Sequence, residues 1–365
     1  MRPRPAFWRA AALLLIALAA AAAATAAEED NPSAVVLLYH HVAEDAPATT
    51  SVTPAVFESH LDHLDSHGYQ VVALSRLLAA VAGGPPLPPR AVAITFDDGY
   101  RSVLTEAAPR LAARGWPFAV FVATDYVDDG YGGYLGWDEL RRLEAAGAEI
   151  GNHSRAHQHY PFRRADESAA AWRERVRADM AWAQQRLTAE LARPLAAIAY
   201  PYGEFTPAVA AIARSLNLAG FGQQSGAAGV HADPTSLPRY PMAAGYADID
   251  ELASKLRTRP FRVSVRAPAA PVLDPDAAAP TLELELGGDH ARLDALSCFV
   301  TGQGPPAIRW LDRARGRVAV TAAAPLPVGR SKYTCTAPAD DQAGGHYWYS
   351  HLWMKPPSAD TWYAD

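Results

Sequence analysis

Two adjacent carboxylates, Asp97 and Asp98, stand directly after an apolar stretch, residues 91–96, and directly before Gly99. The apolar stretch predicts a buried strand, and α/β folds bind their ligands at the carboxyl ends of strands. Two aspartates side by side repel each other unless they have different roles. A metal ion that binds one and leaves the other as a base would separate those roles. The alternative is a simple Asp-Asp-Gly turn, because such turns are common.

His153 and His157 provide the second half of a candidate metal site. They are four residues apart and follow a short predicted strand, residues 148–150. In a helical turn this spacing places both imidazoles on one face, where they can share a metal ion. The zinc protease pattern needs Glu directly after the first histidine, and Ser154 stands there instead. Two solvated loop histidines are the alternative, but the aspartates at another strand end favour the metal site.

Alternating strand and helix patterns between residues 34 and 257 must position these side chains. Such alternation predicts parallel strands joined by helical crossovers, in a barrel or a doubly wound sheet. His60, His63 and His67 lie on the first predicted helix and are interpreted as solvated. The predicted strands cover residues 34–39, 71–74, 91–96, 118–123, 148–150, 195–200, 219–221 and 239–242.

The composition changes near residue 267. Residues 267–280 are rich in alanine and proline and are interpreted as a linker, and residues 281–365 carry only strand patterns. Two cysteines, a tryptophan between them and a tyrosine two residues before the second cysteine resemble an immunoglobulin-like sandwich. That architecture has a cross-sheet disulfide, a tryptophan packed on it and a tyrosine corner. An unrelated β domain with one disulfide is the alternative. The residues concerned are Cys298, Trp310, Tyr333 and Cys335.

The first 27 residues have the pattern of a secretory signal peptide. Three arginines precede the apolar run 10–24, and small residues at 24–26 predict cleavage near Ala26 or Ala27. An uncleaved anchor is the alternative. Export implies an oxidising compartment in which the chain's two cysteines can pair. No stretch of the mature chain is long and apolar enough to span a bilayer. The net charge of -6 argues against nucleic acid as a partner.

Three segments, in this order, resemble the motifs of the polysaccharide deacetylases, the NodB-homology family (carbohydrate esterase family four). They are residues 95–99 (TFDDG), 153–157 (HSRAH) and 200–203 (YPYG). The resemblance covers roughly residues 34–256 and implies a distorted (β/α) barrel of about seven strands, within a catalytic domain at 28–266. Residues 38–40 (LYH) also resemble the branch that deacetylates poly-N-acetylglucosamine in bacterial biofilms.

The resemblance implies roles for the residues of the first two motifs. Asp98, His153 and His157 would bind one divalent metal ion. Asp97 would be the general base that takes a proton from a water molecule activated by the metal. Two imidazoles and a carboxylate suit zinc, but also cobalt, nickel or iron.

A histidine would protonate the leaving amine. In most of the family this acid lies late in the chain, in a Leu-x-His motif. The nearest match here is the Gly-Val-His segment that ends at His231, which lacks the leucine. In the biofilm branch the acid lies in the early Tyr-His pair, which matches His40. We therefore favour His40 over His231, with His41 and His159 as weaker candidates.

The third motif departs from the family at its first position. The family usually has an arginine there, which orients the base, whereas residue 199 is alanine. Arg239, on the last predicted strand, could supply that charge, or it could be a surface residue. The backbone near Tyr202 would help to stabilise the oxyanion. Trp137 and Tyr202 could form walls for a sugar ring, although Trp137 could equally pack on its own helix.

The resemblance predicts a secreted, metal-dependent N-deacetylase of an N-acetylglucosamine polymer, with poly-N-acetylglucosamine favoured. Peptidoglycan, chitin oligomers and acetylxylan are alternative substrates, and a glycan-binding protein with a vestigial site is an alternative function. An aromatic cluster near the C-terminus could stack on sugars or form the sandwich core, and the core is preferred. The cluster contains Tyr347, Trp348, Tyr349, Trp353, Trp362 and Tyr363.

Overall fold

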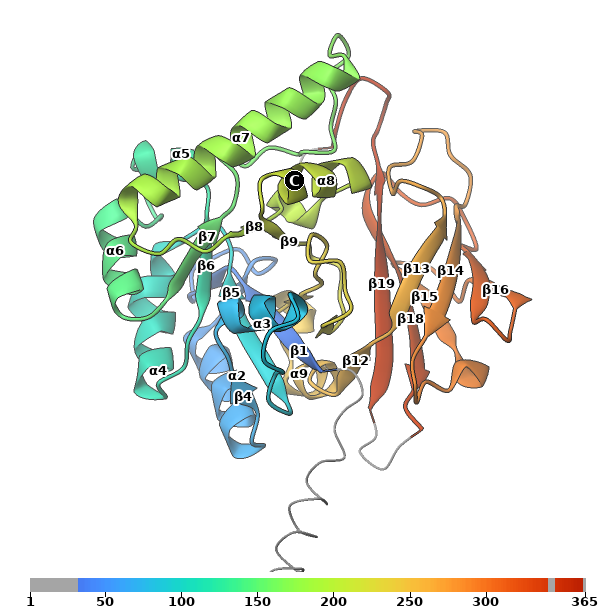
Figure 1. Ribbon diagram of the computed structural model, residues 1–365, viewed down its shortest axis with the longest axis horizontal. Helices are drawn as coiled ribbons and strands as arrows, with labels where there is room; N and C mark the ends of the chain where they lie inside the picture. Colours follow the sequence, from blue (N-terminus) through green and yellow to red (C-terminus); the bar gives the residue numbers. More distant parts are fainter. Residues whose placement is uncertain (1–31, 341–344, 364–365) are drawn as a thin grey trace, which may run out of the picture.

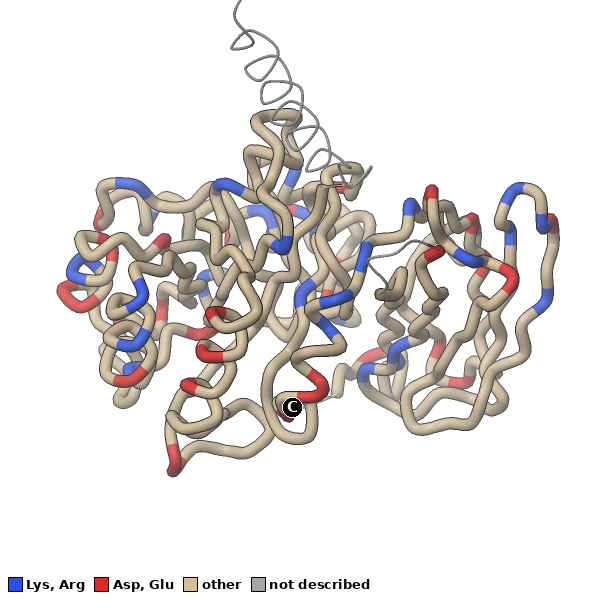
Figure 2. Tube along the Cα trace, turned by 90° about the horizontal axis from the view of Figure 1, so that it is seen from below, with Lys and Arg blue, Asp and Glu red and all other residues tan. Residues whose placement is uncertain are grey.

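The computed structural model describes residues 32–340 and 345–363. The predicted signal peptide, with its cleavage site, therefore lies outside the described residues. The chain forms two lobes that lie side by side, an α/β domain and a smaller β domain (Figures 1 and 2). Basic and acidic residues are interspersed over both lobes (Figure 2). No helix in the described part of the chain combines the length and apolar character that a membrane span requires.

A curled, mainly parallel sheet forms the centre of the α/β domain. Within the described residues its strand order is β10-β1-β5-β6-β7-β8-β9, with β4 beside β5 and β11 beside β1. The expected distorted barrel of about seven strands is confirmed as this curled half-barrel. The strands are β1 (Ser33–Tyr39), β4 (Gln70–Val71), β5 (Ala91–Phe96), β6 (Ala119–Val122), β7 (Glu149–Asn152), β8 (Ala197–Ala199), β9 (Ala219–Phe221), β10 (Ala228–Gly229) and β11 (Tyr240–Pro241).

One short segment, residues 237–241, links the two sides of the curled sheet. Its first residue, Leu237, forms a parallel bridge with Phe221 on β9. Three residues later, Tyr240 pairs with Leu37 on β1. Arg239 lies between these two contacts, so this segment carries its side chain across the gap between β9 and β1.

The two faces of the sheet are packed differently. Alternate residues of β1 point to opposite faces, so Val35 and Leu37 join one apolar cluster and Ala34 and Val36 join another. The first cluster packs under helices α2, α4, α6 and α9. The second cluster is rich in alanine, because small side chains fit the concave side of a tightly curled sheet.

The helices surround the sheet, and the long helix α7 packs against β7 and α8 (Figure 1). Two short strands, β2 (His41–Val42) and β3 (Ser51–Val52), pair beside the end of β1. The helices are α2 (Pro54–Ser66), α3 (Leu74–Val81), η1 (Val103–Ala107), α4 (Ala108–Ala113), α5 (Thr124–Asp128), α6 (Trp137–Ala145), α7 (Ala169–Glu190), η2 (Pro201–Gly203), α8 (Pro207–Ser215), η3 (Ala244–Tyr246), α9 (Ile249–Lys255) and η4 (Leu293–Ala295).

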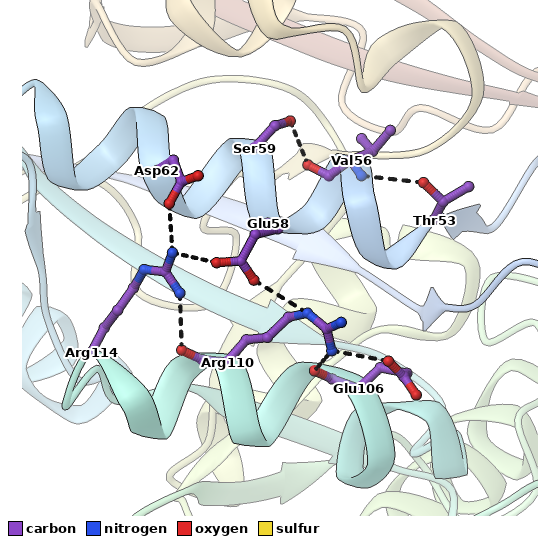
Figure 3. A network of polar contacts seen from close by, with 8 residues as sticks. All are labelled: Thr53, Val56, Glu58, Ser59, Asp62, Glu106, Arg110 and Arg114. Atoms are coloured by element: carbon purple, nitrogen blue, oxygen red, sulfur yellow. Dashed lines mark hydrogen bonds and ion pairs between the residues drawn. The ribbon is translucent and has the colours of Figure 1, made fainter.

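Ion pairs join α2 to the η1–α4 helix that follows β5 (Figure 3). Arg114 contacts Glu58 at 2.5 Å and Asp62 at 2.6 Å, and Arg110 contacts Glu58 at 3.2 Å and Glu106 at 2.9 Å. Exposed pairs of this kind contribute little each, roughly 0–1 kcal/mol. The apolar cluster beneath them therefore holds these helices on the sheet.

The β domain begins earlier in the chain than the sequence suggested. Strands β12 (Thr258–Pro260) and β13 (Arg262–Ala267) already belong to its two sheets. The alanine- and proline-rich segment 267–280 connects β13 to β14 (Thr281–Gly287), which pair with each other in one sheet. This segment is therefore a loop inside the β domain and not a linker between domains. Composition alone did not indicate β13, because this strand lies directly before the alanine- and proline-rich stretch.

Two four-stranded sheets form the described part of the β domain, in the orders β12-β19-β18-β15 and β13-β14-β17-β16. Residues from both sheets contribute to one apolar cluster. The remaining strands are β15 (Ser297–Val300), β16 (Ala307–Asp312), β17 (Arg317–Thr321), β18 (Gly329–Pro338) and β19 (His346–Lys355).

Cys298 and Cys335 form the expected disulfide, but its position differs from the immunoglobulin pattern. They are directly paired residues on β15 and β18, which are neighbouring strands of the same sheet. The bond therefore does not cross between sheets. The sequence spacing is compatible with either arrangement, because it does not state which strands are neighbours. Trp310 lies in the opposite sheet and is only partly buried.

Tyr333 and Trp353 occupy the centre of the β domain instead. Both are fully buried, and their rings meet edge to face at 5.5 Å. The Tyr333 hydroxyl donates to the carbonyl of Pro280 at 2.8 Å and accepts from the amide of Ala322 at 3.1 Å. This tyrosine ties β18 to the neighbouring loops, as the predicted tyrosine corner would.

Candidate metal centre

The turn after β5 presents the two aspartates. Asp98 and Gly99 both have left-handed backbone conformations, with φ of 71° and 75°. A Cβ at position 99 would lie 2.7 Å from Cγ1 of Val122, closer than side-chain atoms approach each other. Glycine at this position is therefore required by both the dihedral angle and the close packing of β6.

The two histidines lie in the loop that follows β7, and not in a helical turn as their spacing suggested. Short hydrogen bonds shape this loop. The Ser154 amide donates to Oδ1 of Asn152 at 2.8 Å, and the His157 amide donates to Oγ of Ser154 at 2.7 Å. These turns bring His153 and His157 together, with ring centroids 4.8 Å apart.

Strained backbone gathers at this site. Among the described residues, seven non-glycine residues have positive φ, and four of them lie within the three motif segments, residues 95–99, 153–157 and 200–203. Such conformations cost on the order of 1–3 kcal/mol each and persist where the surrounding structure enforces them. The four residues are Asp98 (φ 71°), Ser154 (φ 73°), His157 (φ 50°) and Tyr202 (φ 60°).

Three acceptor atoms converge at the centre of the site. Oδ1 of Asp98 lies 3.1 Å from Nε2 of His153 and 3.3 Å from Nε2 of His157, and the two nitrogens are 3.2 Å apart. Nδ1 of His153 lies 2.8 Å from the carbonyl oxygen of Ala199. That carbonyl can only accept, so Nδ1 carries the proton and Nε2 of the neutral ring presents a lone pair.

This arrangement fits a divalent cation. Within the described residues, the three side chains form the group with metal-ligand geometry, and Oδ1 of Asp98 is buried without a hydrogen-bond partner. With ligand distances of about 2.0–2.2 Å, neighbouring ligands in tetrahedral or octahedral coordination are roughly 3.0–3.5 Å apart. The observed triangle has that size. It does not distinguish zinc from the other candidate metals.

The electrostatics of the group also favour a cation. Burial alone would lower the pKa of His153, but the charges of Asp97 and Asp98 outweigh it and raise that pKa. Burial likewise opposes ionisation of Asp98, yet contacts with the two histidines hold the pKa of its carboxyl well below the usual value. Two buried carboxylates therefore make this position strongly attractive to positive charge.

Asp97 is held outside the triangle by Arg239. The guanidinium nitrogens donate to both carboxylate oxygens at 2.7 Å, and both side chains are fully buried. Burial works to raise the pKa of Asp97, but the Arg239 charge and hydrogen bonds outweigh it and the pKa is lowered. Arg239 also donates to the carbonyl of Gly222 at 3.0 Å, and its guanidinium lies 5.5 Å and 6.0 Å from the ring centroids of Phe121 and Phe221.

Arg239 is thus an internal residue, and the surface interpretation is wrong. The chain places this guanidinium on Asp97 from the segment that links β9 to β1. Ala199, at the position where the family usually has arginine, instead contributes its carbonyl oxygen to His153. The motif departure seen in the sequence therefore changes the origin of the orienting charge and not its presence.

His40 lies at the same site, at the end of β1. Burial lowers its pKa, and the nearby charges of Asp98 and Asp97 oppose that shift. His41 points to the adjoining rim, where its ring stacks on Tyr100 with centroids 3.5 Å apart. Burial, followed by the charge of Asp98, raises the pKa of Tyr100. The structure therefore brings the early histidine pair, and not only the metal motifs, to the same end of the sheet.

His231 lies elsewhere, contrary to its candidacy as the acid. It is exposed and follows β10, where Gly229 pairs with Ser33 at the start of β1. The aspartates follow the other end of the sheet, where Phe96 pairs with Tyr39. Six strand residues separate these positions, which is roughly 20 Å. The side chain of His231 lines a cavity beside the β domain instead.

The two residues predicted to line a sugar ring, Tyr202 and Trp137, lie in different surroundings. Tyr202 adjoins the metal ligands, with its ring 4.4 Å from that of His157 and its hydroxyl 3.3 Å from the His157 carbonyl. Trp137 packs on its own surroundings: its indole N–H donates to Asp128 at 2.8 Å, and the Arg186 guanidinium covers its ring at 4.8 Å. Both partners lie on other helices, α5 and α7, and not on the helix α6 that Trp137 begins.

Sequence reasoning missed Glu204 entirely. This fully buried carboxylate lies two residues after Tyr202 and accepts hydrogen bonds from both domains. His159 approaches it at 2.8 Å, Tyr363 at 2.7 Å and Arg330 at 3.2 Å. A glutamate beside a loop motif carries no local pattern that would indicate such partners, because His159 is 45 residues away in the chain and Arg330 and Tyr363 are 126 and 159 residues away.

Comparison with known proteins finds similarity to one family over part of the chain. Residues 84–221 match the family model described as polysaccharide deacetylase. A stretch of 78 residues, 21% of this chain, is 38% identical to the poly-β-1,6-N-acetyl-D-glucosamine N-deacetylase of Escherichia coli (strain K12). This stretch covers 12% of that curated relative, so most of the relative has no counterpart in the match.

Solved structures share the fold of the α/β domain. IcaB from Ammonifex degensii is 25% identical, with a TM-score of 0.53 over 62% of this chain and 97% of that chain. The Streptococcus pyogenes deacetylase PplD, solved in complex with acetate, is 21% identical, with a TM-score of 0.55 over 62% and 99%. A de-N-acetylase from Aggregatibacter actinomycetemcomitans is 19% identical, with a TM-score of 0.56 over 61% and 99%.

Proposed function

We propose that the chain, whose residues 84–221 match the polysaccharide deacetylase family model, removes N-acetyl groups from an N-acetylglucosamine polysaccharide. The observation that carries the proposal is the separation of roles in the Asp-Asp pair. Asp98 faces the two histidines, whereas Asp97 is held beside them by a buried arginine. This separation supports a ligand role for Asp98 and a base role for Asp97.

Asp98, His153 and His157 would hold the cation. When bound, it supplies Lewis acidity, which polarises the acetamide carbonyl and makes water more acidic. Asp97 would then accept the proton of the attacking water; because the pKa of Asp97 is itself lowered, this transfer depends on the acidification of that water. Arg239 keeps the Asp97 carboxylate ionised and fixes its orientation, since it donates to both carboxylate oxygens. Residue 202 and its backbone would line the position of the developing oxyanion.

His40 is the proposed acid that protonates the amine nitrogen as it leaves. Its position at the end of β1 and its electrostatic contact with both aspartates support this role. His231 has no part in it, because it lies at the opposite end of the sheet. His159 is occupied by Glu204, and His41 by the ring of Tyr100.

Poly-N-acetylglucosamine is the favoured substrate. Two features support it: the similarity of 78 residues to an enzyme named for that polymer, and the early Tyr-His pair at residues 39–40. We further propose that the protein acts after export with a zinc ion. The disulfide supports an oxidising compartment, and the two-histidine, one-carboxylate ligand set suits zinc. Arg239 contacts Asp97, so the missing arginine at position 199 no longer argues for the vestigial-site alternative.

Acetate release from defined oligosaccharides tests this proposal. The purified chain, supplied with Zn²⁺, would be incubated with β-1,6-linked N-acetylglucosamine oligomers, chitin oligomers, peptidoglycan fragments and acetylated xylan. We expect release from the N-acetylated glucosamine oligomers, fastest from the β-1,6-linked series. Release from acetylated xylan alone would contradict the N-deacetylase assignment. No release from any substrate, with the metal shown to be bound, would contradict the proposal as a whole.

A further inference from the structure

The segment that follows β19 leaves the β domain and returns to the metal centre. Its residues Trp362 and Tyr363 reach Glu204, in the loop before α8. The indole N–H of Trp362 lies 3.3 Å from Oε2 of Glu204, and the hydroxyl of Tyr363 lies 2.7 Å from Oε1. Arg330, on β18, approaches the same carboxylate. The β domain and its C-terminal extension thus hold a buried charge of the catalytic domain.

An unbroken series of rings leads from this anchor to the metal ligands. The ring of Tyr202 lies 4.4 Å from His157 and stacks on His159 at 4.0 Å. The ring of His159 lies 5.7 Å from that of Tyr363 and 6.2 Å from that of Trp362. The rings of Trp362 and Tyr363 in turn stack on each other at 5.0 Å. The series begins at a ligand and ends on residues of the β-domain side.

We propose that Trp362, Tyr363 and Arg330, together with Tyr202, form a subsite for a sugar unit adjoining the one that is deacetylated. This inference rests on the proposed function, since it takes the substrate to be a polymer that crosses the metal centre. It adds that the second domain supplies part of the substrate site and that the enzyme prefers chains to single sugars.

The chemistry of these side chains matches a sugar. The apolar faces of pyranose rings pack on aromatic rings, and both Trp362 and Tyr363 remain partly exposed despite their anchor. The Arg330 guanidinium lies over the rings of Tyr202 and Tyr363 at 5.4 Å and 6.0 Å. Its side chain is 36% exposed, so part of it faces solvent beside these rings.

The anchor makes this surface rigid. Glu204 is fully buried and accepts from His159 and from the three residues of the β-domain side. Removal of the donors around a buried carboxylate destabilises the folded protein by several kcal/mol, so this contact between the domains resists opening. A preorganised aromatic surface binds a flexible polymer with a smaller loss of entropy on the protein side.

Other aromatic residues of the C-terminal cluster do not serve this purpose. Tyr347 and Trp353 are buried in the core of the β domain, as the preferred interpretation of the sequence expected. Trp348 donates its indole N–H to Ser350 and meets Tyr240 edge to face, at the junction of the two domains. Only the part of the cluster beyond β19 lies along the series of rings that reaches His157.

Oligomer-length kinetics of tail variants test the proposal. Acetate release would be measured for the N-acetylglucosamine monosaccharide, which cannot reach the adjoining subsite, and for the hexasaccharide, with wild type, Trp362→Ala and Trp362→Phe. Trp362→Phe keeps an aromatic face and removes the indole N–H that contacts Glu204. Phe299→Ala is the matched control, because Phe299 is 56% exposed on β15 of the same domain. Calorimetry with metal-stripped protein, which cannot turn substrate over, would measure hexasaccharide affinity directly.

We expect Trp362→Ala to raise KM and Kd for the hexasaccharide about threefold to tenfold, as loss of one stacked ring predicts. The KM for the monosaccharide, the kcat and the bound metal should stay close to those of wild type. Trp362→Phe should lie within about twofold of wild type, as should Phe299→Ala. The inference is overturned if Trp362→Ala binds the hexasaccharide like wild type, or if Trp362→Phe loses as much affinity, which would show that only the Glu204 anchor matters.

The two proposals fail in different ways. If wild type releases no acetate but Trp362→Ala weakens calorimetric binding, the subsite stands and the deacetylase proposal falls. If wild type releases acetate and Trp362→Ala behaves like wild type, the deacetylase proposal stands and the subsite falls. Failure of metal-stripped wild type to bind any hexasaccharide in calorimetry would also contradict the subsite.

Discussion

Replacing Arg239 with methionine should destabilise the catalytic domain more than any surface substitution. The change removes the guanidinium that contacts both oxygens of Asp97 at 2.7 Å and leaves that carboxylate fully buried without its partner. Breaking a buried ion pair on one side costs roughly 3–5 kcal/mol. For a domain of this size each kcal/mol lowers the midpoint of thermal unfolding by roughly 2–4 °C, so the expected loss is about 6–20 °C.

The double variant Asp97→Asn/Arg239→Met separates loss of the charge pair from loss of packing. Replacement of both partners removes the unpaired charge, so much of the stability should return although activity does not. Arg239→Lys should be intermediate, because it keeps the charge but cannot contact both oxygens in the same plane. Thermal unfolding of the four proteins, followed by circular dichroism at matched metal occupancy, would measure these differences.

The pairing of Asp97 with Arg239 predicts the direction in which the stability of the fold changes with pH. Because the pKa of Asp97 is lowered in the folded protein, its pairing stabilises the fold above the unfolded value of about 4. That contribution is lost as the pH falls below about 4, so wild type should lose more stability there than the double variant. A loss of less than about 1 kcal/mol for Arg239→Met at neutral pH would refute the assignment of Arg239 as the buried partner of the base.

Three further predictions concern the acid and the disulfide. His40→Ala should lower kcat about 100-fold or more with metal still bound, as expected for loss of a general acid, and steady-state kinetics with metal analysis would show it. His231→Ala should stay within about twofold of wild type in the same assay, since its side chain is exposed at the far end of the sheet; a larger fall than for His40→Ala would reverse the assignment. Replacement of Cys298 and Cys335 by serine should destabilise the β domain by about 4 kcal/mol, given the sequence separation of 37 residues, and denaturant unfolding would measure this.

Much of the fold could be predicted because the sequence pattern is local. Alternation of apolar strands and helices indicated parallel strands with helical crossovers, and the family resemblance indicated a distorted barrel. The two aspartates at the end of β5 indicated the binding edge. The candidate ligands came from residue type, residue order and the family resemblance. Their loop geometry was not: His153 and His157 meet through left-handed turns, which a four-residue spacing does not specify.

Long-range partners were the part that the sequence left open. Arg239 had two equal interpretations, and only the link between β9 and β1 shows that it reaches Asp97. His60 was interpreted as solvated, yet it is fully buried between the Tyr39 hydroxyl at 3.0 Å and the Ala247 carbonyl at 2.7 Å. Helical periodicity placed it on a helix, but only the packing of α2 against the segment before α9 decides its burial.

The β domain shows the same limit in another form. Cysteine spacing predicted the pair correctly, but strand adjacency depends on topology, so the disulfide lies within one sheet instead of between sheets. The alanine- and proline-rich stretch was interpreted as a linker from composition, although β13 before it already pairs within the β domain. Composition describes flexibility of a segment and not the elements on either side of it.

Metal analysis coupled to acetate release tests the central claim most directly. The claim is that Asp98, His153 and His157 hold one divalent ion while Asp97 acts beside it as the base. Wild type should bind one ion per chain and release acetate, whereas Asp98→Ala should lose both the stoichiometric ion and the activity. A fully active wild type without a stoichiometric ion, or an Asp98→Ala variant that keeps ion and activity, would contradict the account.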